Sequence, residues 1–579
     1  MAIQLGRWTL ALDGTSLPEK SLIGGKAWSI ARMHALGLPV PPAFVITTKA
    51  CAAYLATGAM PVELAAELES GIHWLEQASG RTLGGTLAPL LLSVRSGAMI
   101  SMPGMMDTVL NLGINEATAA ALVAETGDAT FAADTHRRFL ELYARIVLRA
   151  TLPDLATDAP IAAWQTAIHD ATGTTVPATP PEQLMGAVMA VFESWNSRRA
   201  RRYREHHKIA HDLGTAVTVQ VMVFGNLDAQ SGTGVLFSRN PLTGDPAPYG
   251  EYLARAQGED VVSGRFTPLP LSALAAAMPE IHRALLEAAA TLERENGDVQ
   301  DIEFTIQQGH LYLLQSRAAK RAPAAAVRFA VDMVREGRID EATALSRVTA
   351  EQVRMLLSPR LLAGASDNAE VLAQGEAACQ GVGVGVVVAN TDEAERRAQA
   401  GEAVVLARDT TSPDDVHGML VARAVITEQG GATSHAAVVS RALGVPCVVG
   451  CGSGKLASLV GRTVTVDGGT GRIYAGVLPV LAPDEKTEPM LGELAAWATA
   501  RVPLQVLDEQ ATVTARDLDR TTGGEDPAQL ATLAAGAEVL RGAVLNSDEG
   551  VRAAVAAGIK IIVVKQRLPA LLAALAAVT

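Results

Sequence analysis

A histidine near the start of an expected helix is the side chain best suited to covalent chemistry. His435 follows a pair of glycines and two residues that cap helices well, Thr433 and Ser434. The N-terminus of a helix favours an anion because its first N–H groups point outward and its dipole is positive there. A histidine at that place can carry a phosphoryl group on its ring. From this stretch alone, a capping or packing histidine is the simpler interpretation.

Four polar side chains on an expected β-hairpin could hold a metal–polyphosphate complex. Asp301 and Glu303 lie on one face of the first strand, and Gln315 and Arg317 share a face of the second. Carboxylate and amide oxygens are the ligands that Mg²⁺ prefers, and arginine neutralises phosphate charge. A cross-strand ion pair on a solvated hairpin explains the same residues equally well.

A loop rich in glycine, serine and methionine follows another expected strand, within residues 93–108. Its glycines, Gly97 and Gly104, allow backbone N–H groups to approach an anion. Arg95, at the end of the strand, can hold a phosphate through two parallel hydrogen bonds. The alternative is a methionine-rich surface loop that only packs against its neighbours.

Three further motifs are weaker. The glycines of residues 381–385 resemble a dinucleotide-binding loop, but three valines follow where such a loop would open a helix. The sequence Gly24-Gly25-Lys26 lacks the upstream glycine of a P-loop. The arginine-rich stretch 194–212 is best explained as a solvated helix face, because the chain is acidic and the stretch has few aromatic residues.

The composition is that of a large folded protein. The 579 residues correspond to roughly three to five domains, and 49% hydrophobic with 19% charged residues argues against global disorder. The formal net charge of −13 makes nucleic acid and anionic membranes poor partners. Four cysteines cannot form a disulfide framework, and Cys447 and Cys451 have neither a second pair nor a nearby histidine to suggest a zinc site.

The two ends of the sequence suggest no targeting segment. The first residues lack the charged and apolar regions of a signal peptide. The apolar stretch LPALLAALAAVT at the end is too short to span a bilayer. We therefore expect a soluble, cytoplasmic protein without nucleic-acid or membrane partners. The sequence leaves its oligomeric state open.

An α/β multidomain fold must position these residues. Residues 1–324 alternate expected strands and helices, with a mostly helical insert at about 115–212. Residues 325–370 form an alanine-rich helical linker. Residues 371–482 are glycine- and valine-rich strands with a single helix. Residues 483–579 form a small α/β tail.

Together these stretches resemble the pyruvate phosphate dikinase family of phosphoenolpyruvate-utilising enzymes. The similarity covers about residues 20–480, and it rests on the motifs SVRSGAMISMPGMMDTVLNLG, GTAVTVQVMVFGN, GVLFSRNPLTGD, YGEYLARAQGEDVVSG, DIEFTIQQGHLYLLQSR, TSPDDVHGM and GGATSHAAVVSRALGVPCV. The SMPGMMDT loop and the TSPDDVHGM motif favour a dikinase over the related synthase that uses water. The resemblance implies an ATP-grasp domain followed by a swivelling phosphohistidine domain.

The resemblance implies a nucleotide site in the first domain. The residues that would contact phosphates are Lys26, Arg95 and Arg317. The residues that would hold Mg²⁺ are Asp301, Glu303 and Gln315. The adenine strand would comprise Gln220, Met222 and Val223, and Glu259 belongs to the nucleotide site through the motif AQGEDVV.

The resemblance also implies that His435 is phosphorylated, with Arg408 and Thr433 beside it. In that family ATP phosphorylates the histidine, inorganic phosphate takes the γ-phosphoryl group, and AMP and diphosphate leave. Thr433 matches a position of regulatory phosphorylation in the plant dikinases. A mobile histidine domain would carry the phosphoryl group to a separate site, with candidate hinges near 318–324 and 365–372.

The C-terminal tail departs from the family pattern. The third domain of the family is a phosphoenolpyruvate/pyruvate (β/α)8 barrel, which needs about 250 residues. The segment 483–579 is much shorter, and its stretch VRAAVAAGIKIIVVK resembles one β/α unit at most. We therefore expect that this chain alone does not convert pyruvate to phosphoenolpyruvate. The phosphoryl group would pass to a partner chain or to a small molecule.

Two other functions are weighed against this one. A phosphotransferase complete in one chain would bind an acceptor such as an antibiotic on its tail or connector, although the gap between the ATP and histidine regions is short here. A nucleotide-binding regulator would bind ATP without turnover, but the full set of candidate residues argues against it.

Overall fold

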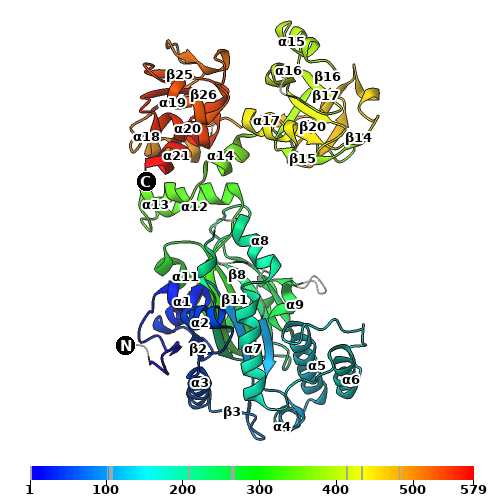
Figure 1. The fold of residues 1–579 in the computed structure, drawn as a ribbon, viewed down its shortest axis with the longest axis vertical. Coiled ribbons are helices and arrows are strands. Elements are labelled where there is room, and N and C mark those ends of the chain that lie inside the picture. Colours follow the sequence, from blue (N-terminus) through cyan, green and yellow to red (C-terminus); the bar gives the residue numbers. More distant parts are fainter. Residues whose placement is uncertain are drawn as a thin grey trace. The chain divides into compact units, whose positions relative to one another are not determined.

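The structure is a computed structural model that describes residues 3–100, 102, 108–206, 209–262, 268–412, 415–431, 434–481, 483–486 and 488–578. The chain divides into two compact units (Figure 1). The first comprises Met1–Asn240 and Pro246–Lys320, and the second comprises Pro241–Asp245 and Arg321–Thr579. The α/β multidomain class expected from the sequence is confirmed.

The first unit contains two antiparallel five-stranded sheets. One has the order β1-β2-β7-β5-β6, with the strands β1 (Thr9–Ala11), β2 (Ala43–Ile46), β5 (Leu92–Gly97), β6 (Thr108–Leu112) and β7 (Ala216–Val221). The other has the order β10-β9-β8-β11-β12, with β8 (Gly232–Phe237), β9 (Tyr249–Ala254), β10 (Leu269–Pro270), β11 (Gln300–Gln307) and β12 (His310–Ala318). A short ribbon pairs β3 (Thr82–Leu83) with β4 (Pro89–Leu90).

Helices cover both sheets of the first unit. They are α1 (Lys20–Ala35), α2 (Thr48–Thr57), α3 (Leu64–Ser79), α4 (Glu116–Thr126), α5 (Ala129–Ile146), α6 (Ile161–Thr172), α7 (Pro180–Ser194), α8 (Arg198–His206), α9 (Gly258–Val262), α10 (Leu271–Ala277) and α11 (Pro279–Asn296), with a 3₁₀ turn η1 (His211–Leu213). Phe139 and Phe192 of the helical insert pack on the first sheet. Ile30 of α1 and Leu292 of α11 pack with Phe304 of the second sheet. These two cores hold the sheets in place.

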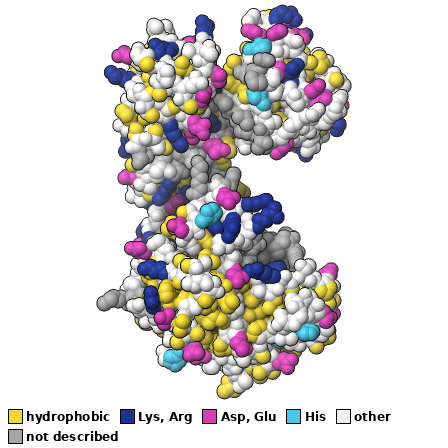
Figure 2. Space-filling view, in the orientation of Figure 1, with side chains coloured by type: hydrophobic (Ala, Val, Ile, Leu, Met, Phe, Trp, Pro, Cys, Tyr) yellow, Lys and Arg dark blue, Asp and Glu magenta, His cyan; other side chains and the backbone are white. Residues whose placement is uncertain are grey.

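The arginine-rich helix α8 is mostly solvated, as its composition predicts. Arg198, Arg201 and Arg202 are exposed. Figure 2 shows Lys and Arg side chains, in dark blue, gathered where Figure 1 places α8. Arg204 is the exception, because it is fully buried and lies over the ring of Trp195, 4.1 Å from its centroid.

An eight-stranded sheet forms one part of the second unit. Its order is β14-β21-β20-β16-β17-β18-β19-β15, with β14 (Val371–Gln374), β15 (Glu376–Cys379), β16 (Val382–Val388), β17 (Val404–Arg408), β18 (Ala424–Thr427), β19 (Cys447–Val449), β20 (Thr463–Asp467) and β21 (Arg472–Ala475). The four neighbours β16 to β19 are parallel, and the other pairs are antiparallel. Its helices are α15 (Thr391–Gln399), α16 (Val416–Val421), α17 (His435–Leu443) and the 3₁₀ turn η3 (Ala457–Leu459).

The connector and the tail form the other part of the second unit. The connector helices are α12 (Pro323–Arg335), α13 (Glu341–Ser346) and α14 (Ala350–Leu357). The tail has a parallel sheet of order β23-β26-β25-β24, with β23 (Gln505–Asp508), β24 (Arg516–Asp517), β25 (Val539–Arg541) and β26 (Ile561–Val564). Its helices and turns are α18 (Pro489–Thr499), η4 (Leu518–Arg520), η5 (Pro527–Gln529), α19 (Leu530–Leu533), η6 (Ala543–Asn546), α20 (Asp548–Ala556) and α21 (Arg567–Val578).

Connector and tail share one hydrophobic core, which includes Val331 and Val353 of the connector with Leu494 and Leu571 of the tail. The tail thus has several strands and flanking helices, and its stretch VRAAVAAGIKIIVVK contributes most of α20 and all of β26. A two-stranded antiparallel ribbon, β13 (Arg360–Leu361) with β22 (Val480–Leu481), joins the chain segments on either side of the eight-stranded sheet. Within the part of the chain that the structure describes, no helix is long and apolar enough to cross a membrane.

Candidate functional site: a charged cavity and a histidine at a helix start

The first unit contains a large cavity with walls from both of its sheets. Its volume is about 1540 Å³, and strands β5 and β7 of one sheet and β8 and β11 of the other contribute lining residues. Four of the sequence-predicted phosphate and metal residues, on β5, β11 and β12, line this space: Arg95, Asp301, Glu303 and Arg317. Segments more than two hundred residues apart thus meet at one wall.

Arg95 connects the two sheets. It lies on β5 opposite Thr218 of β7. Its Nη2 atom lies 3.2 Å from Oε2 of Glu303 on β11. Both side chains are partly exposed, with relative side-chain exposures of 16% for Arg95 and 31% for Glu303, so both can still reach a ligand. The pair places a cation and a carboxylate side by side on the cavity wall.

The β11–β12 hairpin brings its four polar residues together in two direct cross-strand pairs. Asp301 lies opposite Arg317, and Glu303 lies opposite Gln315. Nε of Arg317 donates a hydrogen bond of 2.7 Å to Oδ2 of Asp301. The cross-strand ion pair and the ligand site, which the sequence left as alternatives, therefore coincide, because the ion pair faces the cavity.

The carboxylates of this hairpin suit a divalent cation. Asp301 is buried, and its Oδ1 atom has no hydrogen-bond partner among the described residues. Burial raises the pKa of Asp301, and its hydrogen bond with Arg317 opposes that shift. A cation at Oδ1 would supply the missing partner and favour the ionised carboxylate. Together with Glu303 and the buried amide of Gln315, these donors fit Mg²⁺.

Helix α1 approaches the end of β5 through a glycine. Its geometry breaks at Gly24, which has φ 75° and ψ 167°. A Cβ atom at Gly24 would lie 1.9 Å from the carbonyl oxygen of Gly97, so only glycine permits this contact. The N–H of Gly25 then donates to the carbonyl of Ala98 at 2.9 Å. This close approach brings the next residue, Lys26, to the charged wall.

Lys26 lies in the field of the cavity charges, although its side chain is not among those that line the cavity. The pKa of Lys26 is lowered to about 8, chiefly by burial. The positive charges of Arg95 and Arg317 contribute to this lowering, and the charge of Glu303 opposes it. The ammonium is therefore close to its titration point near neutral pH, and an added polyphosphate would favour its charged form.

The expected adenine strand also borders the cavity. Gln220, Met222 and Val223 all line it. The side chain of Gln220 is turned to the backbone, because its Nε2 donates to the carbonyl of Pro41 at 3.1 Å. The backbone of Glu259 belongs to α9, and its side chain lies outside the described part of the structure. The preceding residues of its motif border the same space.

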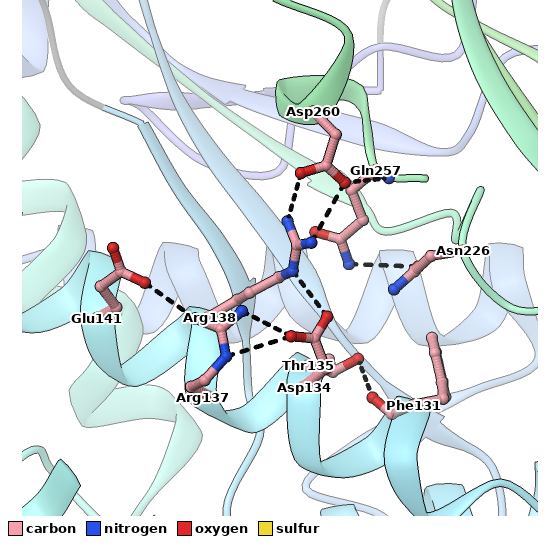
Figure 3. Close-up of polar contacts among 9 residues, drawn as sticks. All are labelled: Phe131, Asp134, Thr135, Arg137, Arg138, Glu141, Asn226, Gln257 and Asp260. Atoms are coloured by element: carbon pink, nitrogen blue, oxygen red, sulfur yellow. Dashed lines mark hydrogen bonds and ion pairs between the residues drawn. The ribbon is translucent and has the colours of Figure 1, made fainter. Parts of the chain in front are cut away.

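A polar network fixes the turn that leads into α9 (Figure 3). Arg138 of α5 donates to both oxygens of Asp260, at 3.0 and 3.2 Å, and to Asp134 at 2.8 Å. Oδ2 of Asp260 also accepts the backbone N–H of Gln257 at 2.9 Å. Gln257 lines the cavity, and its amide donates to Asn226 at 3.4 Å. The helical insert thus holds Gln257, which lines the cavity, in position through Asp260.

Sequence analysis did not single out this network. Asp134 and Arg138 have the i, i+4 spacing of an ion pair on a helix, which was the available local signal. Asp260 lies 122 residues further along the chain and joins them only in the folded unit.

His435 is the first residue of α17 in the second unit. Oγ of Ser434 accepts the N–H of Ala437 at 3.4 Å, so the expected serine cap and helix start are confirmed. Gly430 has a positive φ of 108°, as the tight turn before the helix requires. Thr433, the other expected neighbour of the histidine, lies outside the described residues.

The ring of His435 is oriented by a threonine that sequence analysis missed. Oγ1 of Thr411 lies 3.0 Å from Nδ1 of the ring. Thr411 begins the motif TSPDDVHGM, so its signal was present in the sequence. No described residue is hydrogen-bonded to Nε2 of His435. Among the described residues, Nδ1 is thus the nitrogen that is held, and Nε2 is the candidate for a reaction partner.

Arg408 supports the same turn. It ends β17, opposite Thr427 of β18. Its Nε atom lies 3.2 Å from Oδ1 of Asp415, and Oδ2 of Asp415 accepts the N–H of Ser412 at 2.8 Å. Arg408 therefore acts on the segment that contains Thr411. In the described residues, no direct bond joins Arg408 to His435.

Family models match both regions. The model for the pyruvate phosphate dikinase AMP/ATP-binding domain matches residues 20–74 and 57–272. The model for the mobile domain of PEP-utilising enzymes matches residues 400–471. The first match includes Lys26, Arg95 and much of the cavity wall, and the second includes His435.

Whole-chain relatives agree with these matches. The chain is 40% identical over 508 residues to pyruvate, phosphate dikinase of Clostridium symbiosum, which is 82% of this chain and 58% of the relative. It is 41% identical over 523 residues to pyruvate, phosphate dikinase 2 of Zea mays, and 41% identical over 532 residues to the Rhizobium meliloti enzyme. Each alignment covers 84% of this chain and 59% of the relative. The chain thus spans less than two thirds of the length of these relatives.

The ATP-binding match lies on the unit that holds the charged cavity, and the mobile-domain match lies on the sheet that presents His435. Fold, site and relatives therefore agree: the chain belongs to the pyruvate phosphate dikinase family of PEP-utilising phosphotransferases, with an ATP-grasp domain as its first unit.

Proposed function

We propose that this chain carries out the ATP half-reaction of a dikinase. ATP and inorganic phosphate react with His435, the β-phosphoryl group of ATP moves to Nε2 of the ring, and the γ-phosphoryl group joins phosphate. AMP and diphosphate are then released. Every atom of ATP and phosphate is thus accounted for in phosphohistidine, AMP and diphosphate. The observation that carries the proposal is a histidine at a helix N-terminus whose Nδ1 is held by Thr411 and whose Nε2 has no hydrogen-bond partner among the described residues.

The cavity residues would bind and neutralise the polyphosphate. Lys26, Arg95 and Arg317 would contact its oxygens as three cations. Asp301, Glu303 and Gln315 would hold Mg²⁺, which supplies charge neutralisation and orientation when bound. Strand residues 220–223 would border the adenine, and Glu259 would complete the nucleotide site through its motif.

Around His435 the protein would control the ring and the transferred group. Thr411 holds Nδ1 and so sets which nitrogen attacks. The free N–H groups at the start of α17 would stabilise the phosphoryl oxygens. Arg408 would keep Thr411 in place through Asp415. Thr433 would lie next to the phosphorylated ring.

The eight-stranded sheet would be the mobile phosphohistidine domain. The segments that enter and leave it pair as β13 and β22, which gives a narrow two-stranded connection suited to a hinge. The acceptor would be pyruvate on a partner barrel or another small molecule, because the described tail forms a four-stranded open sheet.

A labelling experiment tests the proposal. The protein is incubated with Mg²⁺, phosphate and ATP that carries ³²P at either the β- or the γ-position. We expect acid-labile label on the protein from the β-position alone, together with AMP and diphosphate. His435→Asn should abolish the label while ATP binding persists.

His417→Asn is the matched control. His417 lies in the same domain, on α16, and its Nε2 lies 3.2 Å from Oδ1 of Asp392. It should take label like the parent protein. Label that persists in His435→Asn would place the nucleophile elsewhere. ATP binding without any label in the parent protein would favour a regulator instead.

A further inference from the structure

Two cysteines lie directly opposite each other in the eight-stranded sheet. Cys379 ends β15, Cys447 begins β19, and the two are partners in the antiparallel register. Opposed residues of this kind have Cα atoms roughly 4.5–5.5 Å apart and side chains on the same face. Disulfides join Cα atoms that are about 4.4–6.8 Å apart. Cys379 comes directly after a bulge in this ladder, and its pairing with Cys447 resumes the register there, so the pair belongs to the class of cross-strand neighbours that a disulfide can join.

Both sulfur atoms also contact the helix that presents the histidine. Sγ of Cys447 lies 3.9 Å from the carbonyl oxygen of Ala436, and Sγ of Cys379 lies 3.6 Å from that of Ser440. Ala436 follows His435 directly, and Ser440 lies about one turn later in α17. Each thiol can donate its S–H to the carbonyl it contacts. A chemical change at these sulfurs therefore acts directly on α17.

Solvent exposure distinguishes Cys379 from the other three cysteines. Cys379 is partly exposed, whereas Cys51, Cys447 and Cys451 are buried. Burial raises the pKa of both Cys51 and Cys451 to about 11, so these thiols stay protonated and unreactive near neutral pH. A dissolved oxidant would therefore meet Cys379 first, with Cys447 directly opposite as the resolving thiol.

We propose that Cys379 and Cys447 form a reversible disulfide in response to hydrogen peroxide, and that this disulfide slows phosphorylation of His435. The Cys379 thiolate attacks one peroxide oxygen, the O–O bond breaks, and the departing hydroxide takes up a proton to become water. The sulfur of Cys447 then attacks the resulting sulfenic acid, loses its proton and expels a second water. Two thiols and one peroxide thus give one disulfide and two waters.

The effect on His435 follows from the contacts. The disulfide removes both S–H donors to α17 and draws the sulfurs to about 2.05 Å from each other. Strands β15 and β19 then shift against the helix whose first residue is His435. The slowing of phosphorylation rests on the proposed function, whereas the disulfide itself does not.

Mass spectrometry of the full-length protein tests the disulfide. The reduced protein is titrated with hydrogen peroxide, and its intact mass and non-reduced peptides are measured. We expect the loss of two hydrogens and a linked peptide pair that contains Cys379 and Cys447, reversed by dithiothreitol. Cys379→Ser and Cys447→Ser should lose the link, and the matched control Cys51→Ser should keep it. A link between Cys447 and Cys451, or no link at all, would overturn the proposed pair.

Labelling from β-³²P ATP tests the regulatory effect on the same samples. The cross-linked protein should take label several-fold more slowly than the reduced protein, and dithiothreitol should restore the rate. Cys379→Ser should label at one rate with or without peroxide. An unchanged rate in cross-linked protein would overturn the regulatory role. If even the reduced protein takes no label, the proposed function fails, while the mass measurement still decides the disulfide.

Discussion

At the scale of single residues, the charged side chains of the cavity in the first unit hold one another in place. Arg95 contacts Glu303, and Arg317 contacts Asp301, so each cation has a carboxylate partner before any ligand arrives. Lys26 lies among these charges and forms no ion pair with the described residues, and its pKa is lowered to about 8. Its protonation therefore reports directly on the electrostatics of the cavity.

The pH dependence of ATP binding should follow Lys26. Its pKa is lowered from 10.5 to about 8, so the free protein loses this proton as the pH rises through about 8. ATP binding favours the ammonium, and the affinity should therefore fall above pH 8, by up to about tenfold per pH unit. Calorimetric titration across this range measures the slope. Lys26→Arg keeps its charge and should remove the slope, and a slope that persists in this variant would assign it to another group.

Oδ1 of Asp301 has no hydrogen-bond partner among the described residues, so we expect that a substitution at Asp301 weakens the binding of Mg²⁺. Asp301→Asn keeps the size of the side chain but replaces one carboxylate oxygen by an amide donor, which repels a cation. The Mg²⁺ concentration needed for half-maximal labelling should rise at least about tenfold. Glu287→Gln, at an exposed carboxylate on α11, is the control and should leave the Mg²⁺ requirement unchanged. Equal Mg²⁺ requirements in the two variants would refute the metal assignment.

At the scale of elements, the helical insert supports the cavity of the first unit through one arginine. Arg138 of α5 contacts Asp260 of α9, and Asp260 in turn accepts the N–H of Gln257, which lines the cavity. Neither α5 nor α9 alone contains the complete network (Figure 3). The position of the wall therefore depends on how these two elements pack.

Arg138→Met should weaken ATP binding although Arg138 itself does not line the cavity. The change leaves Asp260 partly buried without its guanidinium, which should cost about 3–5 kcal/mol of the free energy of unfolding. Arg137→Met is the matched control, because the ion pairs of Arg137 in the described residues are with Asp134 and Glu141 of its own helix, and its only described aromatic contact is with the ring of Trp164, 5.9 Å away on α6, not with α9. Denaturant unfolding and ATP titration measure the two effects. Equal losses in both variants would argue against a role for the Asp260 contact.

At the scale of the whole molecule, the connector and tail fold as one body. Val331 and Val353 of the connector share a core with Leu494 and Leu571 of the tail. The segment between them in sequence forms the eight-stranded sheet, which the chain enters and leaves through the β13–β22 ribbon. The histidine domain is thus an insertion between two halves of one hydrophobic core.

A chain that ends at residue 481 should therefore lose the connector as well as the tail. Its helices α12 to α14 would expose apolar side chains that the tail now buries. We expect rapid proteolysis within residues 323–357 and a tendency to aggregate, while the first unit still binds ATP. Limited proteolysis followed by mass spectrometry shows where cleavage occurs. Unchanged protection of α12 to α14 would mean that the connector is stable without the tail.

Sequence alone determined the features that depend on near neighbours. Alternating side chains and a turn glycine predicted the hairpin of β11 and β12, and the glycine pair with Ser434 predicted a helix that begins at His435. These signals are local, because strand alternation, turns and helix caps involve residues only a few positions apart.

Only the tertiary structure decided which distant residues meet. The contacts of Arg95 with Glu303 and of Arg138 with Asp260 join residues that are 208 and 122 positions apart. Thr411 reaches His435 over 24 positions, and the connector joins the tail across an entire domain. Such contacts depend on the packing of whole sheets and helices against one another. No local pattern encodes them, because burial of apolar faces, rather than the polar residues themselves, brings these elements together.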